Sequence, residues 1–395
     1  MKNFLNKENL IYLSLMALPL YLVRFSIFGI PTNTFELIAI ISITVFWLGR
    51  RGSKIELGAY QKYLIPIGLI IIGLSLSMLF NGTYSVGLGI IKSWFIIPMA
   101  FSVVAVLVLQ HEKHKTVFSA LYVSAFLVAF LALVSFILGQ STFDGRLQSI
   151  FNSPNYLAMF LSPAVIIGLV NFKKNKKLYG ISLIIIVSAL YLTFSYAAWL
   201  ALFLAVVAIY LWQNKKSDYK KRISILVLSM MLVTFSQIGT SKFSSLIQSG
   251  ERSSLASRVM IWKAAGKMII DRPIIGIGPG NFQAKYLAYQ KYFPPYLEWA
   301  VPEPHNIFLA FWLQSGILGL IGFLVLIYLW GKDWMKTKNN LSDTALIAGA
   351  IMIIFLLHGV FDTTYFKNDL AVLFWIVFFA NIKNPENTQG IKETN

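Results

Sequence analysis

The stretch that decides the fold is residues 154–222, PNYLAMFLSPAVIIGLVNFKKNKKLYGISLIIIVSALYLTFSYAAWLALFLAVVAIYLWQNKKSDYKKR. It alternates long apolar runs with basic clusters at Lys173–Lys177 and Lys215–Arg222. At about 1.5 Å per helical residue, each run can cross roughly 30 Å of hydrocarbon. The pattern predicts three membrane-crossing helices, over 154–171, 178–195 and 196–213, with both basic clusters on the same side.

The composition of the whole chain excludes a soluble globular protein. Hydrophobic residues make up 57% and charged residues 13% of the 395 positions, and the mean hydropathy is +0.68. Soluble domains carry about 25% charged residues, so this chain has too little charge to cover a globule in water. The absence of cysteine excludes disulfides and thiolate chemistry. The four scattered histidines predict no metal site.

Apolar runs continue on both sides of the opening stretch, and together they predict an all-α polytopic membrane protein of about 12 transmembrane helices. The expected spans are 9–29, 33–49, 63–80, 90–110, 117–138, 154–171, 178–195, 196–213, 223–240, 305–330, 342–361 and 366–382. The predicted transmembrane domain is 1–382. It includes one large extracytoplasmic loop, 241–304, between the ninth and tenth helices, and a polar cytoplasmic tail follows at 383–395.

The net charge of +18 is a signal of topology and not of nucleic-acid binding. Alternate connections hold 22 of the 34 Lys and Arg, whereas the short loops of the other side hold only Arg146 and Lys367. Positive residues stay on the cytoplasmic side, so the expected location is the inner (cytoplasmic) membrane with both termini inside. Anionic lipid head groups are the expected electrostatic partners.

The large outer loop is where we expect the function, because it is the one long segment outside the membrane. Its first part, Arg252 to Ile270, predicts an interfacial helix that ends before Pro273. The apolar stripe expected on this helix consists of Leu255, Val259, Trp262 and Ile269. Gly276, Gly278 and Gly280 follow, either as a simple turn or as an anion-binding nest of backbone N–H groups.

Three positions carry possible chemistry, each with a plainer alternative. His305 begins the tenth helix, where the helix dipole should keep it neutral and able to act as a base; the alternative is an interfacial histidine satisfied by water. Arg258 can bind a phosphate with its planar fork, or extend to lipid phosphates. His358 and Asp362 lie four residues apart, which favours a structural hydrogen-bonded pair over a catalytic dyad.

The joint arrangement of these residues resembles the O-antigen ligase and polymerase superfamily. The motifs that carry the resemblance are His305-Asn306 with Gly316 and Gly319, Arg258-x-x-x-Trp262, Asp271-x-Pro273-x-x-Gly276-x-Gly278-x-Gly280-x-Phe282, Asn152-Ser153-Pro154-Asn155-Tyr156-x-Ala158, and Thr193-x-Ser195. The strong part covers residues 252–320.

The resemblance implies an inverting, metal-independent glycosyltransferase that needs no cofactor. It would move a glycan from an undecaprenyl-diphosphate carrier to a hydroxyl of a lipid or glycan acceptor on the outer face. His305 and Arg258 would be its catalytic residues, as the base and the diphosphate clamp. Asn306 and Asp362 are further expected substrate-binding residues.

One departure from the family pattern predicts a substitute residue. Many relatives carry an arginine directly after Thr-x-Ser, where this chain has Tyr196. A diphosphate beside a single arginine would be poorly neutralised, so we expect a second cation. Arg146 is the first candidate, Arg252 is the next, and Tyr196 could contribute a neutral hydrogen bond.

Two other functions compete with the ligase. A repeat-unit polymerase of the same superfamily would use the same motifs. A flippase for the lipid-linked glycan would need ionisable residues near mid-membrane, and the predicted spans offer almost none.

Overall fold

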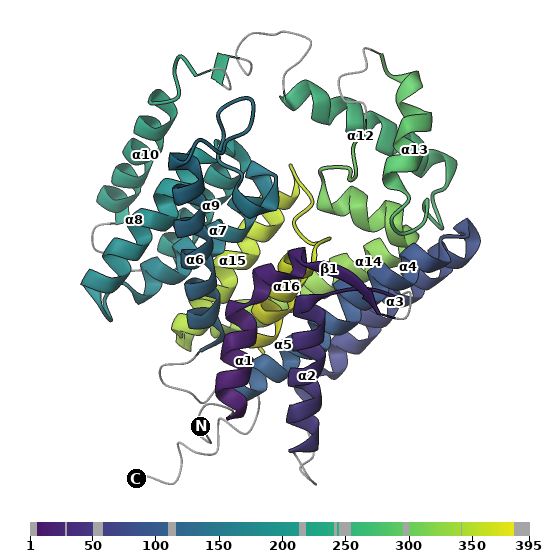
Figure 1. Ribbon diagram of the computed structural model, residues 1–395, viewed down its shortest axis with the longest axis horizontal. Helices are drawn as coiled ribbons and strands as arrows, with labels where there is room; N and C mark the ends of the chain where they lie inside the picture. The colour runs from purple at the N-terminus through teal and green to yellow at the C-terminus, as the bar shows by residue number, and fades with distance from the viewer. Residues whose placement is uncertain are drawn as a thin grey trace.

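The computed structural model describes residues 6–27, 30–49, 58–109, 116–212, 219–240, 243–244, 254–294, 300–340 and 342–382. Within them the chain is almost entirely helical, with one two-stranded hairpin (Figure 1). The predicted tail, 383–395, and Arg252 lie outside the described residues.

The helices follow the chain in a simple order. The α-helices are α1 (Lys7–Met16), α2 (Thr34–Leu48), α3 (Gln61–Asn81), α4 (Tyr84–Ile90), α5 (Ile97–Leu109), α6 (Val117–Ile137), α7 (Pro154–Asn171), α8 (Lys176–Leu192), α9 (Tyr196–Trp212), α10 (Tyr219–Phe235), α12 (Ser254–Asp271), α13 (Phe282–Tyr289), α14 (Ile307–Lys336), α15 (Asp343–Gly359) and α16 (Asn368–Ala380). Short 3-10 turns are η1 (Leu18–Leu22), η2 (Gly58–Tyr60), η4 (Ser149–Phe151), η5 (Gln290–Tyr292) and η6 (Thr337–Asn340), and η3 (Ile91–Ile96) is a π-helical turn between α4 and α5.

Five helical segments in the described part of the chain are long and apolar enough to cross a membrane. They are Gly58–Asn81, Tyr84–Leu109, Val117–Ile137, Pro154–Asn171 and Ile307–Lys336. Four shorter apolar helices, α2, α9, α15 and α16, accompany them. A chain with this many long apolar helices is a membrane-embedded protein.

The first predicted span, 9–29, is wrong. Helix α1 stops at Met16, η1 follows with Pro19 near its start, and strands β1 (Arg24–Ile27) and β2 (Ile30–Asn33) then pair as an antiparallel hairpin. Proline lacks the N–H that would continue the helix. The structure is therefore not strictly all-α.

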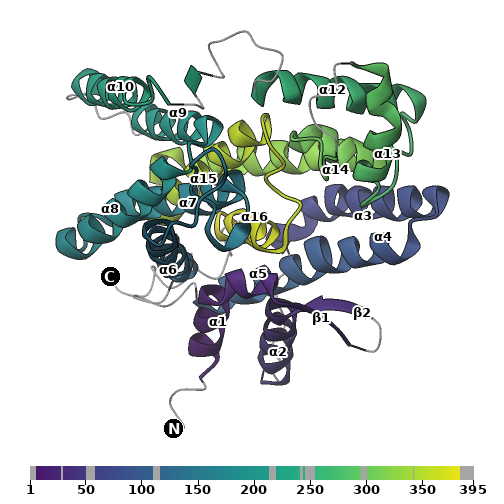
Figure 2. The same ribbon diagram turned by 45° about the horizontal axis from the view of Figure 1, so that its top comes forward.

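Helix α16 lies in the centre of the molecule (Figure 2) and almost all of its side chains are buried. It packs against α5, α15, η1 and α7. The long helix α14 makes its main contact with α3, where Gly73 and Gly319 allow the two backbones to approach closely. This packing brings the loop that follows α15 next to the start of α14.

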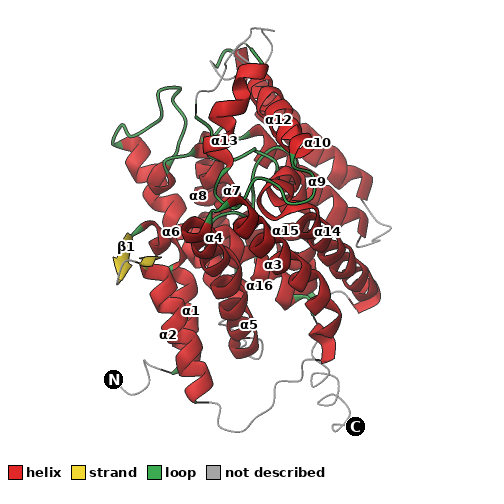
Figure 3. Cartoon of the chain, turned by 90° about the vertical axis from the view of Figure 1, so that its right-hand side faces the viewer, coloured by secondary structure: helices red, strands yellow, loops and turns green. Residues whose placement is uncertain are grey.

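The segment of α12 and α13 forms a second, smaller core. Helix α12 packs on α14 and on α13 through Met260, Ile261, Met268 and other apolar side chains. Figure 3 shows α12 and α13 at one end of the molecule, together with most of the loops. Of the predicted apolar stripe of α12, Leu255 and Val259 are exposed, while a different face of the helix, with Met260 and Ala264, is buried.

Candidate functional site

Asp362 is the centre of a polar network between α15 and α16. It is 1% exposed. Its Oδ1 lies 2.8 Å from Nδ1 of His305 and accepts the N–H of Thr363. Its Oδ2 accepts a hydrogen bond from Asn155 at 3.0 Å and lies 3.7 Å from Nη2 of Arg258. One buried carboxylate therefore joins residues from four separate parts of the chain.

His305 is held in an unusual backbone conformation just before α14. Its φ is +47°, a left-handed value that few residues with a side chain adopt. The next residue, Asn306, caps α14 through the N–H groups of Phe308 and Leu309 and donates to the carbonyl of Val360. Strain of this kind persists where the surroundings fix it, and it is concentrated at functional sites.

The ionisation of Asp362 determines which ring nitrogen of His305 donates a hydrogen bond and which can accept a proton. Burial raises the pKa of Asp362, but the charge and hydrogen bond of His305, together with Arg258, outweigh it and hold that pKa well below its ordinary value. An ionised carboxylate can only accept hydrogen bonds. Nδ1 of His305 must therefore be the donor, which leaves Nε2 of the neutral ring free to accept a proton.

The surroundings of His305 act against the neutrality that the helix dipole was expected to give. Burial lowers the pKa of His305, but the charge and hydrogen bond of Asp362 outweigh it, and the pKa of His305 is raised overall. The ring is therefore a stronger base than an ordinary histidine, and its protonated form is stabilised by the carboxylate.

Helix α12 contacts both of the loops that carry the His305–Asp362 pair. Arg258 donates from Nε to the carbonyl of Phe361 at 2.8 Å and from Nη1 to Ser254 at 2.8 Å. One turn later, Trp262 donates from Nε1 to the carbonyls of Pro304 and His305. With the Arg-x-x-x-Trp spacing, Arg258 therefore contacts the loop of Asp362, and Trp262 contacts the loop of His305.

Arg146 and Arg258 line the same cavity, which has a volume of about 200 Å³. Arg146 is 9% exposed; it donates from Nε to the carbonyl of Thr193 and from Nη2 to Asn155. Burial lowers the pKa of Arg146, Asp144 opposes this, and the nearby charge of Arg258 lowers the pKa further. Two cations that repel each other across one cavity favour an anion between them.

The remaining predicted residues are distributed around this network. Tyr196 lines the same cavity as the two arginines. Asn306 is used as a helix cap and not as part of the cavity wall. The predicted pairing of the His358 and Asp362 side chains is wrong, because the carboxylate turns towards His305 and neither ring nitrogen of His358 has a hydrogen-bond partner among the described residues.

The glycine run is part of the packing and not an anion nest. Gly276 and Gly278 are buried, against the backbone of α14 and against Asn81 with Thr83. The amide of Ile277 donates to the carbonyl of Leu313. The amide of Gly276 donates to the carbonyl of Arg272, so these two amides are used within the protein.

Sequence reasoning gave no role to three polar residues beside the network. Asn155 bridges Arg146 and Asp362, and its only signal was its place in the Asn-Ser-Pro-Asn motif. In the sequence, Lys367 stands out only as a basic residue in a predicted outer loop. Glu303 lies between two prolines, and burial raises its pKa to about 7 although Lys367 opposes this.

Two known sequences or families are similar to parts of this chain. A family model described as O-Antigen ligase matches residues 181–324, which include α12 and most of α14. A protein of Rickettsia conorii named "Putative polysaccharide ligase" is 30% identical over 193 residues, which is 46% of this chain and 44% of the relative. The chain thus matches less than half the length of that relative.

The fold defines a membrane-embedded protein, and the family match shows that residues 181–324 are similar to O-antigen ligases. The resemblance to the O-antigen ligase superfamily that the motifs predicted is confirmed.

Proposed function

We propose that the protein is a glycosyltransferase of the inner membrane. It moves a glycan from undecaprenyl diphosphate to a hydroxyl acceptor at the outer face, with both termini in the cytoplasm. The observation that carries the proposal is the His305–Asp362 pair next to a cavity with two arginines. Such a transfer needs a base and a site for the diphosphate. We assign the base to His305 and the diphosphate site to the cavity that Arg146 and Arg258 line.

The donor diphosphate binds between Arg146 and Arg258. Each guanidinium uses two of its N–H groups for the hydrogen bonds described above, so several donors remain for phosphate oxygens. Arg146 supplies the second cation that the family arginine would give at Tyr196. As the bond between the anomeric carbon and the phosphate oxygen breaks, the two arginines stabilise the charge on the leaving diphosphate.

The acceptor hydroxyl is activated by His305. Its proton passes to Nε2 as its oxygen attacks the anomeric carbon opposite the diphosphate, which inverts that carbon. The electron pair of the broken bond leaves with undecaprenyl diphosphate. Asp362 stabilises the imidazolium that forms, and the proton is later lost to water.

The test is an assay of purified protein in nanodiscs with a labelled oligosaccharide on undecaprenyl diphosphate. His305→Ala should lower transfer about a hundredfold or more, since a positioned base contributes about 10²–10⁴, while binding of undecaprenyl diphosphate persists. Arg258→Lys should weaken that binding, because a lysine lacks the planar fork. Near-normal transfer by His305→Ala would remove the base from the proposal.

A polymerase of the same superfamily is the second candidate. In a polymerase, a second molecule of the lipid-linked glycan is the acceptor, and the same base and the same two arginines would act on it. The same assay with the lipid-linked glycan alone separates the two. Longer glycans on the carrier indicate a polymerase, and transfer only to an added acceptor indicates a ligase.

A further inference from the structure

Asn155 lies between the arginine cavity and the His305–Asp362 pair. It is in the first turn of α7, and it is one of the residues that line the cavity. Its Oδ1 accepts a hydrogen bond from Nη2 of Arg146 at 2.9 Å, and its Nδ2 donates to Oδ2 of Asp362 at 3.0 Å. The other oxygen of Asp362 lies 2.8 Å from Nδ1 of His305. Hydrogen bonds thus connect a cation of the cavity with the ring of the proposed base.

The residues before Asn155 determine where its side chain lies. Asn152 has a φ of +52°, a left-handed value that asparagine adopts more readily than most residues. Ser153 caps α7 with its side chain, and Pro154 occupies the first helical position. Asn155 therefore lies at a fixed place at the start of α7. This helix packs against α15 and α16, the two helices that the loop of Asp362 connects (Figure 2).

The chemistry of its two neighbours determines how the amide of Asn155 is turned. A guanidinium has only donors, and an ionised carboxylate has only acceptors. Arg146 must therefore face Oδ1 and Asp362 must face Nδ2, which is the orientation in the structure. An ionised carboxylate in place of the amide could not donate to Asp362, and an apolar side chain could bond to neither neighbour. An amide of this length makes both bonds at once.

Each of the two bonds acts on a different part of the proposed reaction. The bond from Arg146, together with its bond to the carbonyl of Thr193, fixes the guanidinium and leaves other N–H groups for phosphate oxygens. The bond to Asp362 occupies Oδ2, so that Oδ1 remains for His305. A donor stabilises the negative charge of a carboxylate. The amide therefore also limits how strongly Asp362 stabilises the protonated ring.

We propose that Asn155 is a positioning residue for glycan transfer, whose amide couples the donor cation Arg146 to the base His305 through Asp362. This role rests on the proposed glycosyltransferase function. Asn155 takes no proton in it. The amide keeps the diphosphate site and the base in one fixed arrangement, so that a bound donor meets a base that is already oriented.

The other charged groups around the pair stay in place when Asn155 is changed. Burial lowers the pKa of His305, Asp362 raises it, Arg258 lowers it and Glu303 raises it. His358 acts on the ionisation of Asp362 as well. A change in the pH dependence of an Asn155 variant therefore reports the loss of the amide.

The test removes the amide and measures donor binding and the pH dependence of transfer separately, in nanodiscs. Asn155→Leu nearly keeps the size of the side chain and removes both bonds. It should raise the Kd for undecaprenyl diphosphate about tenfold, since a hydrogen bond to a charged group is lost. It should lower kcat about tenfold or more, since the base is less well oriented. The acid limb of the pH–rate profile should move to higher pH, because Asp362 then stabilises the protonated ring more strongly and transfer requires the neutral ring.

Three further variants show whether the amide itself is responsible. Asn155→Gln keeps an amide, and the cavity beside it has room for one more methylene, so this variant should recover most of the donor affinity and the acid limb of the wild type. Asn155→Ala removes the same bonds without apolar bulk and gives the same reading if Asn155→Leu does not fold. Asn171→Leu is the matched control at the other end of α7, where the amide donates to the carbonyl of Ile167 in the same helix.

The outcomes separate the role of Asn155 from the function on which it rests. If the wild type transfers no glycan, the proposed function fails, and the role of Asn155 fails with it. If the wild type transfers normally and Asn155→Leu keeps both the Kd and the acid limb, only the role of Asn155 is wrong. If Asn155→Leu loses activity while the acid limb stays in place, or if Asn155→Gln recovers nothing, Asn155 is a structural residue and the proposal is overturned.

Discussion

At the scale of single residues, the site depends on the contact between His305 and Asp362. The carboxylate both fixes the tautomer of the ring and stabilises its protonated form. Catalysis requires the unprotonated ring, so the rate should fall as the pH drops through the raised pKa of His305. The pH at which the rate falls therefore tests whether Asp362 acts on the ionisation of His305, because a purely structural residue would leave that pH unchanged.

Asp362→Asn should change the pH profile in a defined direction. Without the carboxylate, burial and the charge of Arg258 both lower the pKa of His305, so the acid limb of the profile should move to lower pH. The maximal rate should also fall about a hundredfold, since the ring loses its orientation and its counter-charge. The measurement is the rate of glycan transfer across pH for both proteins. An acid limb that stays in place would mean that Asp362 does not control the ionisation of His305.

At the scale of elements, the segment around Pro273, which follows α12, is bonded to helix α14. Inside α14, Gly316 has φ +67° and ψ −171°, and its backbone breaks the helix. The amide of Ile317 donates to the carbonyl of Ile274, and the amide of Ile277 donates to the carbonyl of Leu313. The glycines of two sequence motifs, Gly276 and Gly316, thus meet at one joint between α14 and the loop.

Gly316→Ala should destabilise the protein by about 2 kcal/mol or more, because these angles are nearly restricted to glycine and a β-carbon would collide with the carbonyl of Ile274. Thermal unfolding in detergent measures the effect. Gly331→Ala on the same helix is the control, since its β-carbon would meet open space and alanine favours the helix. Equal stability of both variants would show that the joint is not needed.

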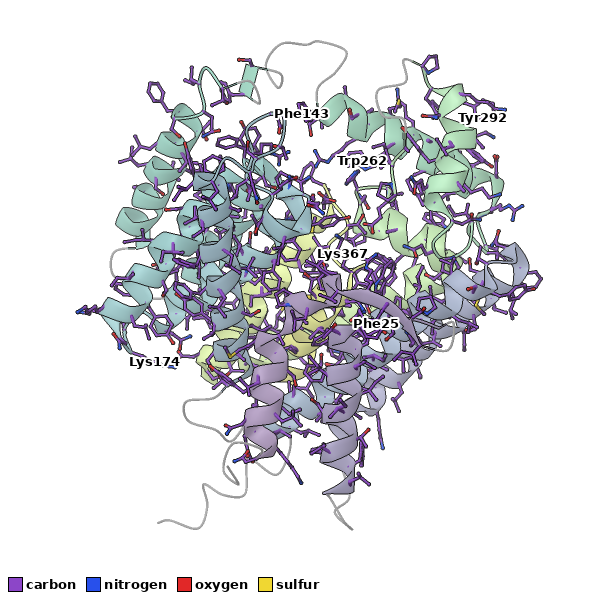
Figure 4. All side chains as sticks on the ribbon, in the orientation of Figure 1. Phe25, Phe143, Lys174, Trp262, Tyr292 and Lys367 are labelled. Atoms are coloured by element: carbon purple, nitrogen blue, oxygen red, sulfur yellow. The ribbon has the colours of Figure 1, made fainter. Side chains whose placement is uncertain are left out.

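At the scale of the whole molecule, the proposed function requires the arginine cavity to face outward. Phe143 lies at the upper edge of the molecule in the loop that also carries Arg146, and Lys174 lies towards the opposite end (Figure 4). Both side chains are exposed. Since the chain has no cysteine, single cysteines can report the side of the membrane.

Phe143→Cys should react with a membrane-impermeant maleimide in intact spheroplasts, and Lys174→Cys only after permeabilisation. The reason is the excess of Lys and Arg in the connection that holds Lys174. Labelling is read on the purified protein, with the cysteine-free chain as the blank. The reverse labelling pattern would place the arginine cavity on the cytoplasmic side and contradict glycan transfer at the outer face.

The sequence by itself determined the class of protein and the position of most helices. Helix α7, for example, occupies 154–171 as predicted, and α8 and α9 divide near Tyr196. Hydropathy and helix-breaking residues act within a short stretch of chain, so they can be read without the fold. The same holds for α12 and for its end at Asp271.

Only the tertiary structure decided which residues meet. Asp362 lies 57 residues from His305 and four from His358, and the local spacing suggested the wrong partner. The choice depends on how α14, α15 and α16 pack and on the anchoring of two loops by α12. Asn155 and Asp362 likewise meet across a sequence separation of 207, because helix packing, unlike hydropathy, brings together residues that are distant along the chain.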